Sequence, residues 1–139
     1  MATNLVVPQI GCKALLNIMI GGWTGYKLHL FSNNVTVTDT TLIGSLTEST
    51  FGGYAAAVVS GWSAAANDAS NGAFTQASLV TFTPTGAGLP ANIYGYYFTD
   101  AAGSPTLLWA QNDPNAPVVL SNTSQSYTIT PYFDFNSQF

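Results

Sequence analysis

The first 25 residues carry a hydrophobic pattern that is typical of a short helix. In "PQIGCKALLNIMIGG" the apolar positions lie one, three and four residues apart, at Ala14, Leu15, Ile18 and Met19, and this spacing places them along one side of a helix. Pro8 suits the start of a helix, because the first turn does not need its missing N–H, and the glycines at 21–22 predict the end. A helix this short is not stable alone, so we expect it to dock on the rest of the chain or on a neighbouring subunit.

Beyond Gly25 the pattern changes to the alternation of half-buried strands. In "YKLHLFS", Tyr26, Leu28 and Leu30 fall on one face and the residues between them on the other. The stretch "NNVTVTDTTLIGSL" continues the β pattern. Later apolar runs are "SLVTFTP", "NIYGYYFTD", "TLLWAQ", "VVL" and "QSYTITPYFDF". In the last run Pro131 predicts an edge strand or a bulge, because proline cannot donate to a β ladder.

These runs predict the fold class. About seven or eight short strands, about 8–14 residues apart, are separated by Gly, Pro, Asn or Ser, which is the spacing of sandwiches and barrels. We therefore predict an all-β protein, a jelly-roll-like β-sandwich with one short N-terminal helix. Residues 1–24 are expected to form an arm and helix that pack on the domain or on a neighbour. Residues 25–139 are expected to form a single β-sandwich domain.

The stretch "ANIYGYYFTDAAGSPTLLWA" concentrates aromatic residues on two neighbouring strands. Alternation places Tyr94, Tyr96 and Phe98 on one face of the first strand, and Leu107 and Trp109 on one face of the second. Aromatic residues that share a face of two paired strands build a core, so we predict core positions for these aromatics. A carbohydrate-stacking platform is the alternative, with the acids at 100 and 113 as the groups that would grip sugar hydroxyls.

The composition limits the classes of partner that the chain is expected to bind. Charged residues make up 6% of the chain, with two Lys, no Arg and six acids, whereas a soluble domain typically has about 25%. Without clustered cations the chain is not expected to bind nucleic acid, and no apolar run reaches the length of about 18 residues that spans a membrane. An uncharged polar surface is easily desolvated against other protein, so the composition favours assembly.

Candidate chemistry is sparse. His29 is the only histidine and Cys12 the only cysteine, and no serine lies in a nucleophile elbow. Zinc prefers several Cys and His ligands, and the acids show no spacing that gathers them for calcium. The residues therefore predict neither an enzyme nor a bound cofactor or metal.

Five segments, in this order, carry a resemblance: "VPQIGCKALLNIMI", "LHLFSNNVTVTD", "LTESTFGGYAA", "IYGYYFTDAAGSPTLLWAQ" and "YTITPYF". Together they resemble small structural proteins of tailed bacteriophages, of the capsid cement (decoration) type. The resemblance spans nearly the whole chain. Cys12 and Gln111 stand where the pattern has acids, and "SNTSQS" stands where a Gly-Asp turn is usual.

The resemblance implies a jelly-roll protein on the surface of a phage head, assembled in virions that are made in the host cytoplasm. The implied partners are the major capsid protein and further copies of the chain, as a homotrimer. We expect the N-terminal helix to dock on one of them, through the candidate interface residues Leu15, Leu16, Ile18, Met19 and Trp23. The alternative placement covers one mouth of the sandwich. The alternative functions are another virion component (tail, fibre or head-vertex protein) and a carbohydrate-binding module.

Overall fold

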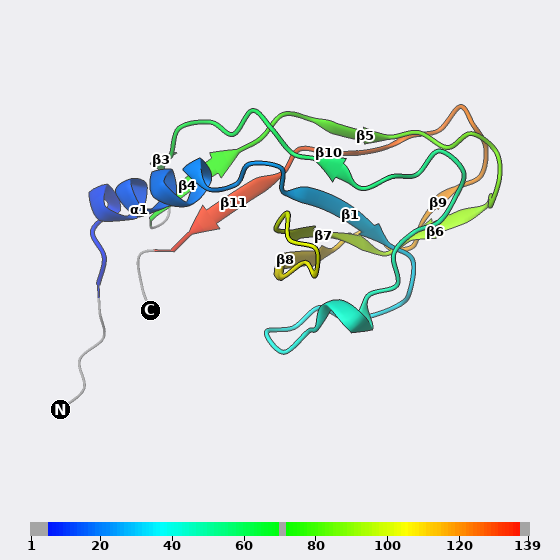
Figure 1. Ribbon diagram of the computed structural model, residues 1–139, viewed down its shortest axis with the longest axis horizontal. Helices are drawn as coiled ribbons and strands as arrows, with labels where there is room; N and C mark the ends of the chain where they lie inside the picture. Colours follow the sequence, from blue (N-terminus) through cyan, green and yellow to red (C-terminus); the bar gives the residue numbers. More distant parts are fainter. Residues whose placement is uncertain (1–5, 70–71, 137–139) are drawn as a thin grey trace. The chain divides into compact units, whose positions relative to one another are not determined.

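A computed structural model describes residues 6–69 and 72–136 and is shown in Figure 1. These residues form one α-helix, one short 3-10 helix and eleven short strands, and their strand pairs are antiparallel. The prediction of an all-β protein with one short N-terminal helix is confirmed, whereas jelly-roll topology stays a prediction. The chain divides into two compact units, which are described one at a time.

The first unit combines the helix α1 (Gln9–Gly21) with a three-stranded sheet. Its strands are β3 (Ala66–Asn67), β4 (Ala73–Gln76) and β11 (Tyr132–Phe135), in the order β11-β4-β3. The helix follows Pro8 and is capped by Gly22, close to the ends that the residue pattern predicts. It contacts β3 and β4 through a side that carries Cys12 and Leu16, both fully buried.

This unit draws on three parts of the chain. Its first part ends at Thr24 and the second unit begins at Gly25, which is the boundary expected from the sequence. The unit also takes residues 59–79 and the stretch that begins at Thr130, both of which were expected to belong to a single domain over 25–139. These parts supply the strands that cover Cys12 and Leu16, so α1 packs on its own chain. Residues 1–5 and 137–139 of the two expected domains lie outside the described residues.

The second unit holds the remaining strands in three sheets. They are β1 (Lys27–Phe31), β2 (Ala57–Val58), β5 (Val80–Phe82), β6 (Ala91–Ile93), β7 (Gly95–Thr99), β8 (Leu107–Asn112), β9 (Val118–Leu120) and β10 (Tyr127–Ile129). A four-stranded sheet has the order β2-β1-β7-β8, and two-stranded sheets pair β10 with β5 and β6 with β9. The run "QSYTITPYFDF" is divided at Pro131, since β10 ends before it and β11 begins after it. β11 is an edge strand, as the proline predicts.

Two residues of the aromatic stretch do not lie on the sheet face that strict alternation predicts. The register pairs Phe98 with Trp109 but Thr99 with Leu107, so β8 contains a bulge that turns Leu107 to the face opposite Trp109. Tyr94 falls in the break between β6 and β7 and packs against a cluster of Phe31, Leu46 and Tyr97. The expectations that Leu107 shares a face with Trp109, and Tyr94 with Phe98, are therefore wrong.

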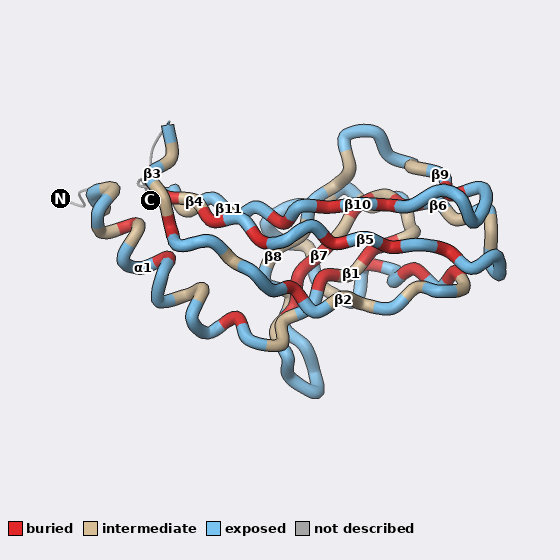
Figure 2. The backbone as a smooth tube through the Cα atoms, turned by 90° about the horizontal axis from the view of Figure 1, so that it is seen from above, coloured by how far each residue is buried: buried red, intermediate tan, exposed pale blue. Residues whose placement is uncertain are grey.

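The four-stranded sheet is covered on both faces. Leu28 and Leu30 lie on one face, paired with Phe98 and Tyr96, and neither leucine has exposed surface. The other face carries the cluster of Phe31, Leu46 and Tyr97. Figure 2 accordingly shows buried stretches along β1 and β7.

The segment 33–46 does not form the strand that its pattern predicts. It contains the 3-10 helix η1 (Ile43–Ser45), and its apolar residues Val35, Val37 and Ile43 pack against the same cluster. The segment is not held by the hydrogen-bond ladder of a strand. Instead, the Val37 N–H donates to the Asn112 side chain at Oδ1, 2.8 Å away. The segment thus covers a face of the sheet instead of extending it.

Candidate functional site

The side of α1 that faces away from its sheet is apolar. Figure 2 shows only short buried stretches along this helix. Ile10 is 79% exposed and Ile18 is 73% exposed. We define the outer face of α1 as its exposed apolar residues, which are Ile10, Ala14, Leu15, Ile18 and Gly21. An amphipathic helix normally turns polar residues to solvent, so this face is the reverse of the usual arrangement.

The amide side chains of α1 bind its own chain instead. Gln9 donates from Nε2 to the Asp68 carbonyl oxygen at 2.9 Å, and Asn17 Oδ1 accepts the Ala65 N–H at 2.9 Å. Lys13 is half-buried. Both amide groups therefore tie the helix to its own unit, although Asn17 itself is exposed, so the exposed residues of α1 are apolar apart from Asn17.

The five predicted interface residues separate into two groups. Leu15 and Ile18 are exposed on the outer face, and Met19 is half-buried. Leu16 and Trp23 are buried within the first unit, where the Trp23 ring contacts Trp62 edge to face, with the ring centroids 4.8 Å apart. Both side chains are therefore covered by their own chain, and a partner contact through any of the five residues stays a prediction. Ile10, four and eight residues before Ala14 and Ile18, was missed although its spacing marks the same stripe.

The predicted core aromatics also differ in burial. Phe98 has no exposed surface, while Tyr94, Tyr96 and Trp109 are half-buried. The Trp109 ring stacks on Phe98 with their centroids 4.8 Å apart, and Tyr96 meets its edge at 6.3 Å. The tryptophan therefore has one ring face against its own core.

The two acids considered for sugar binding are engaged in their own loops. Asp100 Oδ1 accepts the N–H groups of Ala102 and Thr106, and the bond from Thr106 is the main cause that lowers the pKa of Asp100. Asp113 accepts the Tyr127 hydroxyl and the Asn115 N–H. The bonds from Ala102 and Asn115 are those expected of turn-forming aspartates, and the Tyr127 hydroxyl joins Asp113 to β10.

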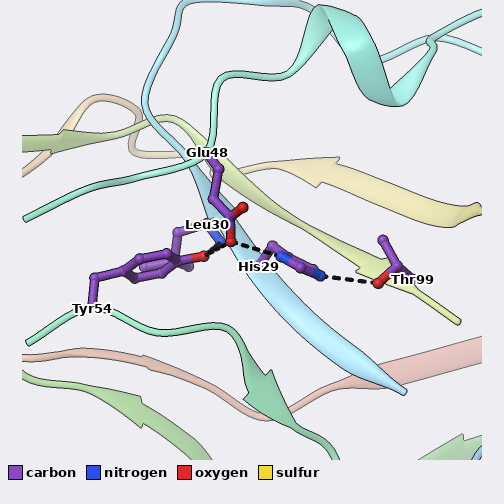
Figure 3. Close-up of polar contacts among 5 residues, drawn as sticks. All are labelled: His29, Leu30, Glu48, Tyr54 and Thr99. Carbon is purple, nitrogen blue, oxygen red and sulfur yellow. Dashed lines mark hydrogen bonds and ion pairs between the residues drawn. The ribbon is translucent and has the colours of Figure 1, made fainter. Parts of the chain in front are cut away.

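A polar network surrounds His29 on β1 (Figure 3). Nδ1 of the imidazole lies 2.8 Å from Glu48 Oε1, and Nε2 lies 2.9 Å from Thr99 Oγ1. Tyr54 donates its hydroxyl to the same Glu48 oxygen at 2.8 Å and accepts the Leu30 N–H at 3.0 Å. The imidazole also stacks on Tyr97, with the centroids 4.6 Å apart.

The order carboxylate, imidazole, hydroxyl is that of a nucleophile triad, but the surroundings serve structure. Thr99 is 1% exposed, so its side chain presents almost no surface, although a pocket of about 220 Å³ lies beside His29 and Thr99. The N–H of the next residue, Asp100, donates to the Thr106 carbonyl at 3.3 Å and is not available to an oxyanion. The network instead joins β1 to β7 and to the segment that carries Glu48 and Tyr54. The prediction that the chain is not an enzyme stays a prediction.

Burial changes the acidity of the phenols in this network. It raises the pKa of Tyr97 to about 12, with the nearby Glu48 charge as a second cause. Burial also raises the pKa of Tyr54 far above its usual range, and the bond to Glu48 adds to that shift. The Tyr54 hydroxyl therefore stays protonated at neutral pH and keeps its role as the donor to Glu48. Sequence spacing could not reveal this site, because Glu48 and Tyr54 lie on irregular segments.

Metal binding and membrane insertion each require a particular arrangement of residues. Within 6–69 and 72–136, no three His, Cys, Asp or Glu side chains are grouped so that they could hold a metal ion. Among the same residues, no helix has the length and apolar composition that crossing a bilayer requires.

Comparison with protein-family models, with curated proteins and with solved structures finds no match to this chain. The fold itself defines the class of small all-β proteins with one N-terminal helix.

Proposed function

We propose that this chain is a structural virion protein of the capsid cement type, which binds the shell of a phage head through the outer face of α1. The observation that carries the proposal is the exposure of Ile10 and Ile18 on a helix whose two amide side chains bond to its own chain. Exposed apolar patches of this kind mark protein contacts. The segment resemblance and the 6% charged content point in the same direction.

The proposed partners are the major capsid protein, which receives the outer face of α1, and further copies of the chain in a homotrimer on the head surface. A closed ring lets each copy use the same pair of patches. Each contact needs a buried area of about 1,200–2,000 Å² in total, which is more than one helix of 13 residues supplies. The helix is therefore the anchor of a larger interface.

A decoration assay tests the proposal. Purified shells that lack the protein are mixed with the wild type or with the double variant Ile10→Gln/Ile18→Gln, and bound copies are counted after sedimentation. Loss of the two isoleucines should weaken binding by about 100-fold, since each contributes about 1.5 kcal/mol when buried. Leu42→Gln is the matched control, because Leu42 is also 73% exposed but lies outside α1.

The outcomes separate the candidate functions. Wild-type binding at hundreds of copies per shell, lost in the double variant and kept in Leu42→Gln, supports the cement function. Unchanged binding of the double variant overturns the role of α1. A few copies per particle identify a tail, fibre or head-vertex protein instead, and sugar binding on a glycan array identifies a carbohydrate-binding module.

A further inference from the structure

Strand β8 is one edge of the four-stranded sheet, and its peptide groups alternate in direction. The Asp113 N–H donates to the Tyr94 carbonyl at 2.9 Å, which marks residues 94 and 113 as a hydrogen-bonded pair. Hydrogen-bonded and non-bonded pairs alternate along an antiparallel ladder. The register pairs Phe98 with Trp109 and Tyr97 with Ala110, so the peptide groups of Trp109 face β7 and those of Ala110 face outward.

The outward side of β8 is open. Within residues 6–69 and 72–136, no backbone hydrogen bond outside the strand ladders reaches Ala110. A pocket of about 480 Å³, here called the slot, is lined by residues 107–110 of this edge strand and by Val37, Thr38, Asp39 and Thr41 of the segment that covers one face of the sheet. The slot thus lies between an edge strand and a loop.

The Asn112 side chain holds the far wall in place. It accepts the Val37 N–H at Oδ1, 2.8 Å away, and donates from Nδ2 to the Val35 carbonyl at 2.6 Å. The loop beyond is closed by the Thr38 N–H, which donates to Thr41 Oγ1 at 2.8 Å. Because the loop is bound by the Asn112 side chain and not by the backbone of β8, it does not pair with Ala110 as a neighbouring strand would. A preformed slot of this kind lowers the ordering cost of binding.

The lining also defines the chemistry of an occupant. The wall along residues 107–110 offers main-chain donors and acceptors, which an extended peptide satisfies by adding a strand. Asp39 is the charged residue among those that line the slot, and no Lys, Arg or His lines it. The matching occupant is an extended chain with a cationic side chain opposite this carboxylate.

We propose that the free edge of β8 binds an extended peptide segment of another protein, which pairs with residues 107–110 and places a Lys or Arg beside Asp39. Four residues of strand span about 13 Å, so the bound segment is short. This site lies on the second unit and does not depend on the outer face of α1.

Backbone NMR with a defined probe tests the proposal. The probe is a small set of blocked synthetic pentapeptides with Lys at the centre and Val or Thr on either side. Binding should shift the amide signals of Leu108 and Ala110 and slow hydrogen exchange of the Ala110 N–H by about tenfold or more at saturation. The same peptides N-methylated at the central residue should have no effect, because they cannot complete the ladder.

Two variants test the two parts of the site. Ala110→Pro removes an outward N–H without removing a bond to β7, and it should abolish binding. Asp39→Asn should weaken binding by about fivefold at low salt, and by less at about 1 M NaCl, where exposed charges are screened. Asp134→Asn, which removes an exposed acid of β11 outside the slot, should leave binding unchanged. If Ala110→Pro fails to fold, the N-methylated peptides and Asp39→Asn decide the question.

Three results would overturn the proposal: an Ala110 amide that stays unprotected at millimolar peptide, equal binding of the N-methylated peptides, or equal binding by Asp39→Asn at low salt. Protection of Ala110 that rises with protein concentration alone would also overturn it, because the occupant would then be a second copy of this chain. None of these readouts involves shells, so failure here is distinct from failure of the decoration assay.

Discussion

Gly95 is the residue at which β7 comes closest to its neighbours. A Cβ there would collide with the carbonyl oxygen of Gln111 and lie 2.6 Å from Cζ of Phe31. Glycine therefore lets the Phe31 ring lie over β7, in the way that aromatic residues cover strand glycines. We expect Gly95→Ala to lower the free energy of unfolding by about 3 kcal/mol, the upper range of overpacking costs. Gly103→Ala, where nothing lies within 4 Å, is the control for urea unfolding, and equal midpoints for the two variants would contradict this.

The contribution of Tyr54 to stability depends on its hydroxyl oxygen. Its hydroxyl accepts the Leu30 N–H and donates to Glu48, and Leu30 has no exposed surface. Tyr54→Phe leaves that N–H without an acceptor, so we expect a loss of about 1–3 kcal/mol in urea unfolding. Tyr96→Phe removes a hydroxyl that donates to the exposed Gln111 and should cost less. A smaller loss for Tyr54→Phe than for Tyr96→Phe would contradict the assignment.

Tyr97 gives the fold a dependence on alkaline pH. Burial raises its pKa to about 12, against about 10 in an unfolded chain. Below about pH 10 both states hold the proton, and above it the unfolded state loses the proton first, so Tyr97 lowers stability by at most about 1.4 kcal/mol per pH unit. Tyr54 and Tyr127, whose pKa values burial also raises, add to this decline. Tyr97→Phe should make this decline shallower in guanidinium unfolding between about pH 9 and about pH 11. An identical slope in the variant would show that another group is responsible.

At the scale of single residues, the sequence shows which residue types are present but not which side chains they contact. The alternation over residues 26–32 placed His29 opposite Leu28 and Leu30, and the strand has that alternation. Nothing in the spacing connects His29 to Glu48 or Thr99, which lie 19 and 70 positions away. Such contacts depend on how the chain returns to the sheet, and one sequence does not contain that information.

Among the elements, α1 has one buried side and one exposed side. Substitutions on the two sides should change the free energy of unfolding by different amounts. Leu16 has no exposed surface, whereas Ile18 is 73% exposed. Leu16→Ala should therefore lower the free energy of unfolding by about 2–5 kcal/mol through the cavity it leaves. Ile18→Ala should change it by less than about 0.5 kcal/mol. Thermal unfolding at low protein concentration measures both, and comparable losses would mean that Ile18 is covered by another copy.

The elements that the pattern predicted are those with strong local signals. Proline and glycine mark both ends of α1, and the predicted runs at 26–32, 78–84 and 118–120 contain β1, β5 and β9. The stretch 63–77 has no alternation, yet it contains β3 and β4, because α1 and β11 cover them. The bulge in β8 was also invisible, since the extra residue at Leu108 becomes apparent only against its partner strand. Elements that depend on tertiary contacts are those that the sequence did not reveal.

For the whole molecule, scarcity of charge is the property that connects fold and proposed function. The formal net charge is −4 from six acids and two lysines. Asp100 and Asp113 are used within loops, and Glu48 is used within the His29 network. Few charges are therefore left to repel or to attract a partner across the outer face of α1. Association through this face has to come from apolar burial.

That inference predicts how decoration responds to salt. Because the outer face of α1 carries no charged side chain, shell binding should change by less than about threefold between about 0.1 M and about 1 M NaCl, although the Debye length falls from about 10 to about 3 Å. Sulfate should strengthen binding, because it favours apolar burial. Co-sedimentation with shells measures both responses, and the β8 peptide probe provides an internal comparison, since its lysine should make that contact weaken with salt. A tenfold loss of decoration at high NaCl would mean that charged groups outside α1 drive the association, and the helix would then be a secondary contact.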